Sequence, residues 1–280
     1  MNWLYKGAPL LRADGRCSVM GILNVTPDSF SDGGQAFLPD LAVARASEML
    51  VQGADILDLG GESTRPGAEP VPADEEWRRV GPVLEQLREQ VPQALLSIDT
   101  FKPEVARQAT ALGVQIVNDI TGLDPAGQMG EVVAESGASL VIMHMQGTPA
   151  TMQNNPQYDD VVGVVLAFFE QRLRFAERLG IGPERIALDP GIGFGKRLEH
   201  NISLLQSMDR FRQLGSVVLI GTSRKRMIGE LTGRVVSERM AGSVASAIYA
   251  AWQGASIVRV HDVAETADGL NVWSALTGKN

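Results

Sequence analysis

Each short apolar run along this chain ends in a polar or ionisable side chain rather than in a small apolar residue. Taken singly, any of these side chains could cap a helix or satisfy a buried partner. If the runs are parallel strands of a barrel, however, their carboxyl ends meet at one mouth, and we expect one shared polar ligand site. The set comprises Asn24, Asp58 with Glu62, Asp99, Asn118, His144, Asp189, Ser223 with Lys225, and Arg259 with His261.

Part of this set suits a flat heterocycle. Carboxylates accept hydrogen bonds, whereas amides both donate and accept them. Asp99, Asn118 and Asp189 therefore match a ring with adjacent N–H, NH2 and C=O groups.

The last two runs are followed by cations. Lys225, Arg259 and His261 suit a phosphate or pyrophosphate group, which requires positive charge and N–H donors. Barrels of parallel strands often bind phosphate beside strands 7 and 8. We therefore expect one ligand that has a donor-rich ring and a phosphorylated arm.

The elements that must position these side chains repeat along the chain. The apolar runs are mostly continuous rather than alternating, as expected of parallel strands covered on both faces. Residues spaced three and four apart between the runs predict helices, and Trp77, Val80 and Leu84 are one example. The runs span residues 17–23, 55–60, 94–99, 114–119, 139–144, 185–190, 217–222 and 256–261.

Strands that alternate with helices in this way predict an α/β protein, a single-domain (β/α)8 TIM barrel over residues 1–280. A doubly wound open sheet is the alternative, and it fits less well because the units continue without a break or linker. We expect residues 1–16 to form an extension that closes the barrel bottom. Thr100 is expected to cap the helix that follows the third strand.

Composition excludes several classes of protein. A net charge of −8 disfavours a general nucleic-acid surface. Cys17 is the single cysteine, so no disulfide can form within the chain. The first residues lack the features of a signal peptide, and no apolar run approaches the roughly 18 residues of a membrane span. We therefore expect a soluble cytoplasmic protein.

Two features of the sequence qualify the ligand prediction. The stretch DPGIGFGK (189–196) is neither a phosphate-binding P-loop nor a dinucleotide motif, and we interpret it as a tight turn that brings Phe194 to a flat ligand. The three histidines are not at metal-ligand spacings. A Mg²⁺ bound mainly by pyrophosphate and one protein oxygen would leave almost no trace in a sequence.

Eight blocks of the sequence together resemble the bacterial-type dihydropteroate synthase family. They span almost the whole chain and occur in the family's order. The blocks are MGILNVTPDSFSDGG (20–34), DLGGESTRPGA (58–68), SIDT (97–100), NDI (118–120), MHMQGTP (143–149), LDPGIGFGK (188–196), GTSRK (221–225) and RVHD (259–262).

The resemblance implies a (β/α)8 barrel of folate synthesis that forms a homodimer. It implies that 6-hydroxymethyl-7,8-dihydropterin pyrophosphate condenses with 4-aminobenzoate, and that pyrophosphate is released with assistance from Mg²⁺. Sulfonamides would compete with the aminobenzoate. The implied path is SN1-like: the pyrophosphate leaves first, and the arylamine attacks the resulting cation.

The same resemblance assigns roles to residues. Asp99, Asn118, Asp189 and Lys225 would hold the pterin ring, against which Met143 packs, and Asn24 would bind Mg²⁺. Thr64, Arg259 and His261 would bind pyrophosphate, and Asp99, Lys225, Arg259 and His261 are the expected catalytic residues. Arg65, Pro66, Phe194, Gly221, Ser223 and a mobile loop of Thr26, Pro27, Asp28, Ser29, Phe30 and Ser31 would complete the substrate site.

Other functions are consistent with parts of this pattern. A pterin-dependent methyltransferase would share the barrel and the carboxylates, but it would need a corrinoid partner. A Schiff-base aldolase could use Lys225, although that lysine follows its strand in a charged run. An inactive pterin-binding paralogue is the alternative outside enzymes. Arg224 is expected to pair with a surface carboxylate, and the sequence assigns no role to His144.

Overall fold

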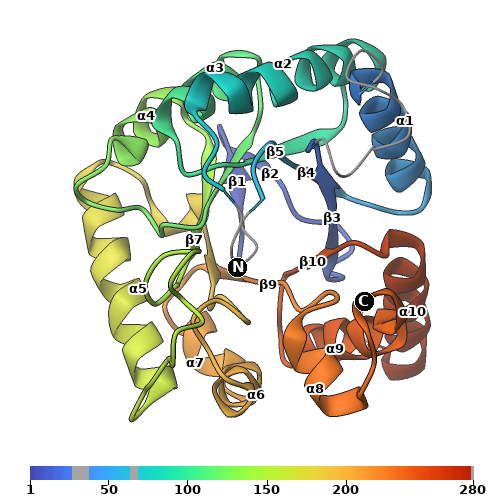
Figure 1. Cartoon of the computed structure of the whole chain (residues 1–280). Helices are drawn as coiled ribbons and strands as arrows, with labels where there is room; N and C mark the ends of the chain where they lie inside the picture. Colours follow the sequence, from blue (N-terminus) through green and yellow to red (C-terminus); the bar gives the residue numbers. More distant parts are fainter. Residues whose placement is uncertain (27–37, 64–68, 279–280) are drawn as a thin grey trace.

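Eight parallel strands form a closed barrel surrounded by helices (Figure 1). This computed structural model describes residues 1–26, 38–63 and 69–278. The strands follow one another around the barrel in chain order, and β10 pairs with β3 to close it. The predicted single-domain (β/α)8 barrel is thereby confirmed. The barrel strands are β3 (Ser18–Asn24), β4 (Ile56–Gly60), β5 (Leu95–Asp99), β6 (Ile116–Asp119), β7 (Ser139–Met143), β8 (Ile186–Asp189), β9 (Val217–Ile220) and β10 (Ile257–Val260).

The helices follow the strands as the apolar spacing predicts. Asp160 caps α5, where its carboxylate accepts a hydrogen bond from the Gly163 N–H at 2.9 Å. The expectation for Thr100 was wrong, because α3 begins at Pro103 and the Thr100 hydroxyl accepts from the Lys102 N–H instead. The helices are α1 (Leu38–Val51), α2 (Ala73–Gln90), α3 (Pro103–Ala111), α4 (Met129–Ser136), α5 (Val161–Arg178), η3 (Pro183–Arg185), α6 (Leu198–Gln206), α7 (Met208–Arg212), α8 (Arg226–Thr232), η4 (Val236–Glu238), α9 (Met240–Trp252) and α10 (Val263–Thr277).

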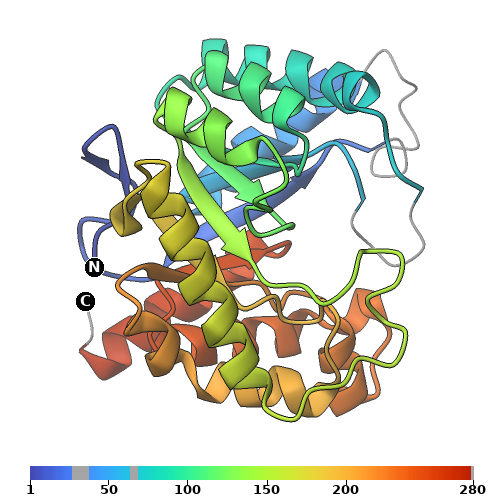
Figure 2. The same ribbon diagram turned by 90° about the vertical axis from the view of Figure 1, so that its left-hand side faces the viewer.

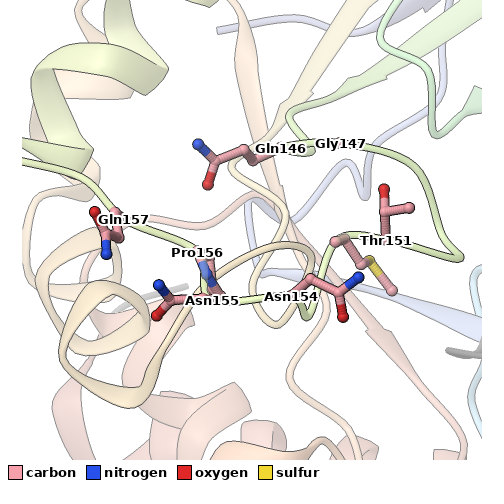
Figure 3. A pocket seen from close by; sticks show the side chains of 8 residues that line it. Gln146, Gly147, Thr151, Asn154, Asn155, Pro156 and Gln157 are labelled. Carbon is pink, nitrogen blue, oxygen red and sulfur yellow. The ribbon is translucent and has the colours of Figure 1, made fainter.

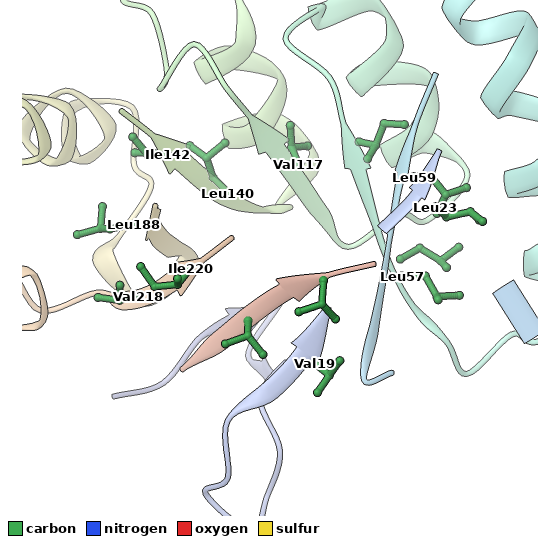
Figure 4. Packing of buried hydrophobic residues seen from close by; sticks show 14 of the residues in the cluster. Val19, Leu23, Leu57, Leu59, Val117, Leu140, Ile142, Leu188, Val218 and Ile220 are labelled. Carbon is green, nitrogen blue, oxygen red and sulfur yellow. The ribbon is translucent and has the colours of Figure 1, made fainter. Parts of the chain in front are cut away.

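Alternate residues of each strand form two separate cores. One set packs outward against the helices, and Val19, Leu57 and Leu140 belong to it (Figure 4). The other set faces the barrel interior, where Met20 and Ile56 lie near the strand starts. Side chains alternate along a strand with period two, so the residue two positions after each member of this inner set also faces inward. Polar side chains near the strand ends thus stack on an apolar floor.

A short hairpin packs on the starts of the barrel strands. It consists of β1 (Leu4–Tyr5) and β2 (Ala8–Pro9), and it lies at the opposite end of the barrel from the long 145–160 loop (Figure 2). Trp3 is fully buried against the inner apolar set, and its indole N–H donates to the Arg185 carbonyl at 3.2 Å. No helix in the described ranges is long and apolar enough to cross a membrane.

Candidate active site

Arg259 lies at the centre of a network that joins four strands. Its Nε donates to Asp58 Oδ2 at 2.6 Å, and its Nη2 donates to Asp99 Oδ2 at 2.7 Å. The Asn118 amide donates to the same Asp58 oxygen at 2.9 Å. These side chains come from β4, β5, β6 and β10, and all four face the barrel interior. Cations and carboxylates are therefore interleaved here, whereas the sequence suggested two separate regions.

Burial and charge act against each other in this network. Burial raises the pKa of Asp99 to about 7, although the Arg259 charge opposes the shift. Burial would lower the pKa of Arg259, but the carboxylates of Asp58 and Asp99 raise it above its usual value. Arg259 thus stays charged, while Asp99 is close to its titration point at neutral pH.

Two buried atoms beneath the network have no partner in the described part of the chain. They are Asp58 Oδ1 and the Ser97 hydroxyl, which belong to register partners on β4 and β5. Buried polar atoms are normally hydrogen-bonded, to water or ligand where no protein group is available. Asp58 and Ser97 therefore have hydrogen-bonding capacity left for a polar molecule.

Lys225 and Asp189 form the second charged group of the site. The Lys225 ammonium donates to the Ile192 carbonyl and lies 4.7 Å from the centre of the Phe194 ring. Burial lowers the pKa of Lys225 to about 8, and the Asp189 carboxylate opposes the shift. Asp189 accepts from the Gly191 N–H at 2.7 Å, and burial raises its pKa. Phe194 thus lies beside the site, as the turn interpretation predicts.

A glycine and a serine shape the rim between β9 and β10. A Cβ on Gly221 would lie 3.7 Å from Lys225 Nζ and 3.8 Å from Arg259 Cβ, so Gly221 lies between these two side chains. The Ser223 hydroxyl accepts from the His261 N–H at 3.1 Å and lies 3.0 Å from His261 Nδ1. Ser223 therefore holds the His261 ring in one orientation.

Arg224 connects the same two loops. The prediction that it pairs with a surface carboxylate was wrong in one respect, because the carboxylate it meets is nearly buried. Arg224 pairs with Asp262, whose side chain is only 9% exposed. Arg224 has a positive φ of 56°, and its N–H donates to the Ser243 hydroxyl at 2.9 Å. This turn therefore joins Ser223 and Lys225 to the β10 loop.

Asn24 lies beside the network, across a glycine. The registers of β3, β4 and β5 place Gly60 between Asn24 and Asp99. A Cβ at Gly60 would lie 3.9 Å from Asn24 Oδ1 and 3.7 Å from Asp99 Oδ2. Two side-chain oxygens thus flank Gly60, which has no side chain of its own. Met143 is buried at the end of β7, in register with Asp189.

Residues 20–261 match the family model described as pterin binding enzyme. The chain belongs to this family. The dihydropteroate synthase of Escherichia coli (strain K12) is 49% identical over 257 residues, which cover 92% of this chain and 90% of that protein.

Solved structures of the pterin binding enzyme family superpose closely. Xanthomonas albilineans dihydropteroate synthase with 4-aminobenzoic acid has a TM-score of 0.88 and 49% identity, covering 95% of this chain and 94% of that one. Yersinia pestis dihydropteroate synthase in a sulfonamide drug complex has a TM-score of 0.92 and 42% identity, covering 99% and 100%.

The side chains of two strand-end residues, Glu62 and His144, pair with groups outside the site. Glu62 and Glu76 both pair with Lys102 beside α2 and α3, and Glu76 is only 1% exposed. His144 packs on Phe168, with ring centres 5.0 Å apart. The strand ends therefore do not all converge on one mouth.

Several residues assigned from the family resemblance lie outside the described residues. These are Pro27, Asp28, Ser29, Phe30, Ser31, Thr64, Arg65 and Pro66. Their contribution to the site stays a prediction.

Asp58 is the main functional residue that the sequence did not assign. The sequence placed it near a strand end, but only the structure shows it holding both Arg259 and Asn118. A signal was present: Asp58 and Gly60 interrupt a buried strand at a spacing of two, which marks the inward face of the barrel.

A separate hollow of about 400 Å³ lies in the long loop after β7 (Figure 3). Its lining contains no charged side chain, which separates it chemically from the network around Arg259. It is lined by Gln146, Gly147, Thr151, Met152, Asn154, Asn155, Pro156 and Gln157.

Proposed function

We propose that this chain condenses 6-hydroxymethyl-7,8-dihydropterin pyrophosphate with 4-aminobenzoate, giving 7,8-dihydropteroate and pyrophosphate. The chain is then a transferase of folate synthesis and a sulfonamide target. The observation that carries the proposal is the network in which Arg259 joins Asp58 and Asp99 on the barrel interior. The similarity to the dihydropteroate synthase of Escherichia coli supports the same activity.

The carboxylates and the amide provide recognition of the pterin. Asp99, Asn118 and Asp189 are inward-facing at the ends of three strands, and each has an oxygen that can accept from a ring N–H or an amino group. Lys225 adds a donor for the ring carbonyl. Burial strengthens each of these hydrogen bonds because the surroundings are less polar than water.

The cations provide stabilisation of the leaving group. The bond between the pterin methylene carbon and the pyrophosphate oxygen breaks, and both electrons leave with the oxygen. Arg259 and His261 stabilise the negative charge that develops there. The methylene cation is delocalised into the ring, where ionised Asp99 favours the positive charge.

The arylamine is the nucleophile in this scheme. Its nitrogen attacks the methylene carbon and then loses a proton to solvent or to the departing pyrophosphate. No serine, cysteine or histidine of this chain needs to form a covalent intermediate. Phe194 lies beside Lys225 and Ser223 contacts His261, and we assign both to the aminobenzoate side of the site.

A Mg²⁺ fits the residues at the mouth. Asn24 Oδ1 and Asp99 Oδ2 flank Gly60, and oxygen donors are the ligands that Mg²⁺ prefers. Within the described residues, no group of three or more His, Cys, Asp or Glu side chains could hold a metal ion, so most ligands would come from the substrate. We therefore propose Asn24 as the protein ligand, and the ion would neutralise pyrophosphate charge.

We also infer a cytoplasmic homodimer. Exposed apolar side chains occur on the contacting helices α8 and α9 and at residues 235–236 between them. Leu231, Val235, Val236 and Trp252 are each more than half exposed, whereas Trp273 packs against the core. Covering exposed apolar side chains removes apolar area from water, which favours the association of two copies. Sedimentation mass, compared with the 30.0 kDa of one chain, tests this proposal.

Pyrophosphate release with and without arylamine is the decisive experiment. The purified chain is mixed with the dihydropterin pyrophosphate, 4-aminobenzoate and Mg²⁺, and both products are followed. Release coupled to dihydropteroate formation supports the synthase. Tight pterin binding without release would instead favour the inactive binding paralogue, and methyl transfer to a corrinoid would favour the methyltransferase.

A further inference from the structure

Lys196 is a buried ammonium group that the proposed chemistry does not use. Its side chain is only 4% exposed, although lysine is rarely buried without partners. Its Nζ lies 3.0 Å from His144 Nδ1, 3.1 Å from the His144 carbonyl and 2.9 Å from the Phe194 carbonyl. An ammonium group has three N–H donors, and three acceptors surround this one.

These contacts join the end of β7 to the glycine-rich turn after β8. A Cβ on Gly191 would lie 1.9 Å from the His144 carbonyl oxygen, and one on Gly195 would lie 2.7 Å from the Gln146 carbonyl oxygen. Both glycines have positive φ, 68° and 61°. The turn therefore lies directly against the β7 loop, and Lys196 bridges the two segments.

The opposite side of the same turn contacts Lys225. A Cβ on Gly193 would lie 3.1 Å from Lys225 Cδ. The Ile192 carbonyl accepts from the Lys225 ammonium, and the Phe194 ring lies 4.7 Å from it. A shift of the turn would therefore move the groups that hold Lys225 in the site.

We propose that Lys196 is a positioning residue, which binds the ring and carbonyl of His144 and the Phe194 carbonyl and thereby fixes the 191–195 turn against which Lys225 is oriented. The predicted effect on substrate turnover rests on the proposed function, whereas the predicted effect on the position of the turn does not.

The charges around Lys196 agree with this role. Burial and the Lys196 charge lower the pKa of His144 to about 3, so its ring is neutral and Nδ1 can accept. Burial lowers the pKa of Lys196 to about 7, with Asp189 opposing and Lys225 adding to the shift. The ammonium form supplies one donor for each of the three acceptors.

Three variants separate hydrogen bonding from packing. Lys196→Met removes the donors but keeps a long side chain. His144→Leu removes the ring acceptor, whereas His144→Asn places an amide oxygen near the Nδ1 position while also losing the ring contacts with Phe168. Lys6→Met is the matched control, because Lys6 is exposed on the hairpin at the other end of the barrel.

Hydrogen exchange of residues 190–197 and steady-state kinetics are measured on the full chain. We expect Lys196→Met and His144→Leu to lose amide protection in this segment and to lower kcat/KM for the dihydropterin pyrophosphate by about 10²-fold, since small displacements have such effects. His144→Asn should keep most of the amide protection and most of the kcat/KM, and Lys6→Met should change neither quantity.

The inference is overturned if Lys196→Met keeps wild-type amide protection of this segment and wild-type turnover in the proposed assay. So does a His144→Asn variant as impaired as His144→Leu, which would indicate ring packing rather than hydrogen bonding. If Lys196→Met does not fold, the His144 pair decides. An inactive wild-type protein would count against the proposed function alone, because the exchange measurement needs no substrate.

Discussion

Arg259 and Asp58 are 201 positions apart in the chain, yet the guanidinium Nε donates to the carboxylate Oδ2 at 2.6 Å. The same oxygen accepts from Asn118, so one carboxylate orients two neighbours from different strands. Asp58 is fully buried, and its charge is compensated mainly by Arg259. This relationship makes Asp58 a positioning residue for groups that touch the substrate.

Asp58→Asn should lower kcat/KM by about 10²-fold, because misplacement of Arg259 weakens contacts made in the transition state. The amide keeps nearly the same shape, so the chain should stay folded. Steady-state kinetics and thermal unfolding measure the two effects. Asp74→Asn, at an exposed position in the first turn of α2, is the matched control. Unchanged kinetics in Asp58→Asn would remove the residue from the site.

Arg259→Ala should reduce turnover by about 10²-fold or more, or about 3 kcal/mol of transition-state stabilisation, in a protein that remains folded. Arg259→Lys should recover only part of this loss, because the single nitrogen of an ammonium group cannot reproduce the planar guanidinium whose two nitrogens donate to Asp58 and Asp99. Circular dichroism checks folding. Turnover near the wild-type rate in the alanine variant would contradict the role given to Arg259.

Asp99→Asn should lower turnover severely and change how stability depends on pH. Burial holds the Asp99 pKa at about 7, above the ordinary 3.8. The folded state therefore binds a proton that the unfolded state has lost, so this residue makes the free energy of unfolding fall as pH rises through that interval.

The variant lacks this titration. Its free energy of unfolding, relative to wild type, should therefore rise as pH increases from about 5 to about 8. Urea unfolding across that range measures the difference. A relative stability that stays constant over this range would show that ionised Asp99 gains more from Arg259 than it loses by burial, because its titration would then lie below pH 3.8.

Asn24→Ala should raise the Mg²⁺ concentration needed for half-maximal turnover by about tenfold, since it removes the proposed protein oxygen. Binding of a dihydropterin without pyrophosphate should be unaffected, and calorimetry provides this comparison. Equal Mg²⁺ dependence in variant and wild type would rule out Asn24 as the metal ligand.

Lys102→Met should destabilise the fold by about 3–5 kcal/mol, because it leaves the buried carboxylates of Glu62 and Glu76 without their cation. One Glu76 oxygen is already without a partner among the described residues. Urea unfolding measures the loss, and adding Glu76→Gln should restore part of it. A double variant no more stable than Lys102→Met would mean that charge repulsion is not the cause.

The order and type of the elements could be predicted from sequence because they depend on local pattern. Buried parallel strands appear as continuous apolar runs, and each predicted run overlaps one barrel strand. The polar residues that end those runs were recognisable for the same reason. The family resemblance added the identity of the ligand, because the residues alone indicated only a donor-rich ring and a phosphorylated arm.

Only the tertiary structure decided which of these polar groups meet. Glu62 and Asp58 are four residues apart, yet Glu62 pairs with Lys102 while Asp58 faces the interior and holds Arg259. His144 and Lys196 likewise meet away from the central network. The direction of a side chain at a strand end depends on strand register and on the loop beyond it, and both are set by contacts between segments distant in sequence. The sequence by itself therefore determined the barrel and its kind of ligand. The closed packing of the strands decided which polar side chains pair with one another.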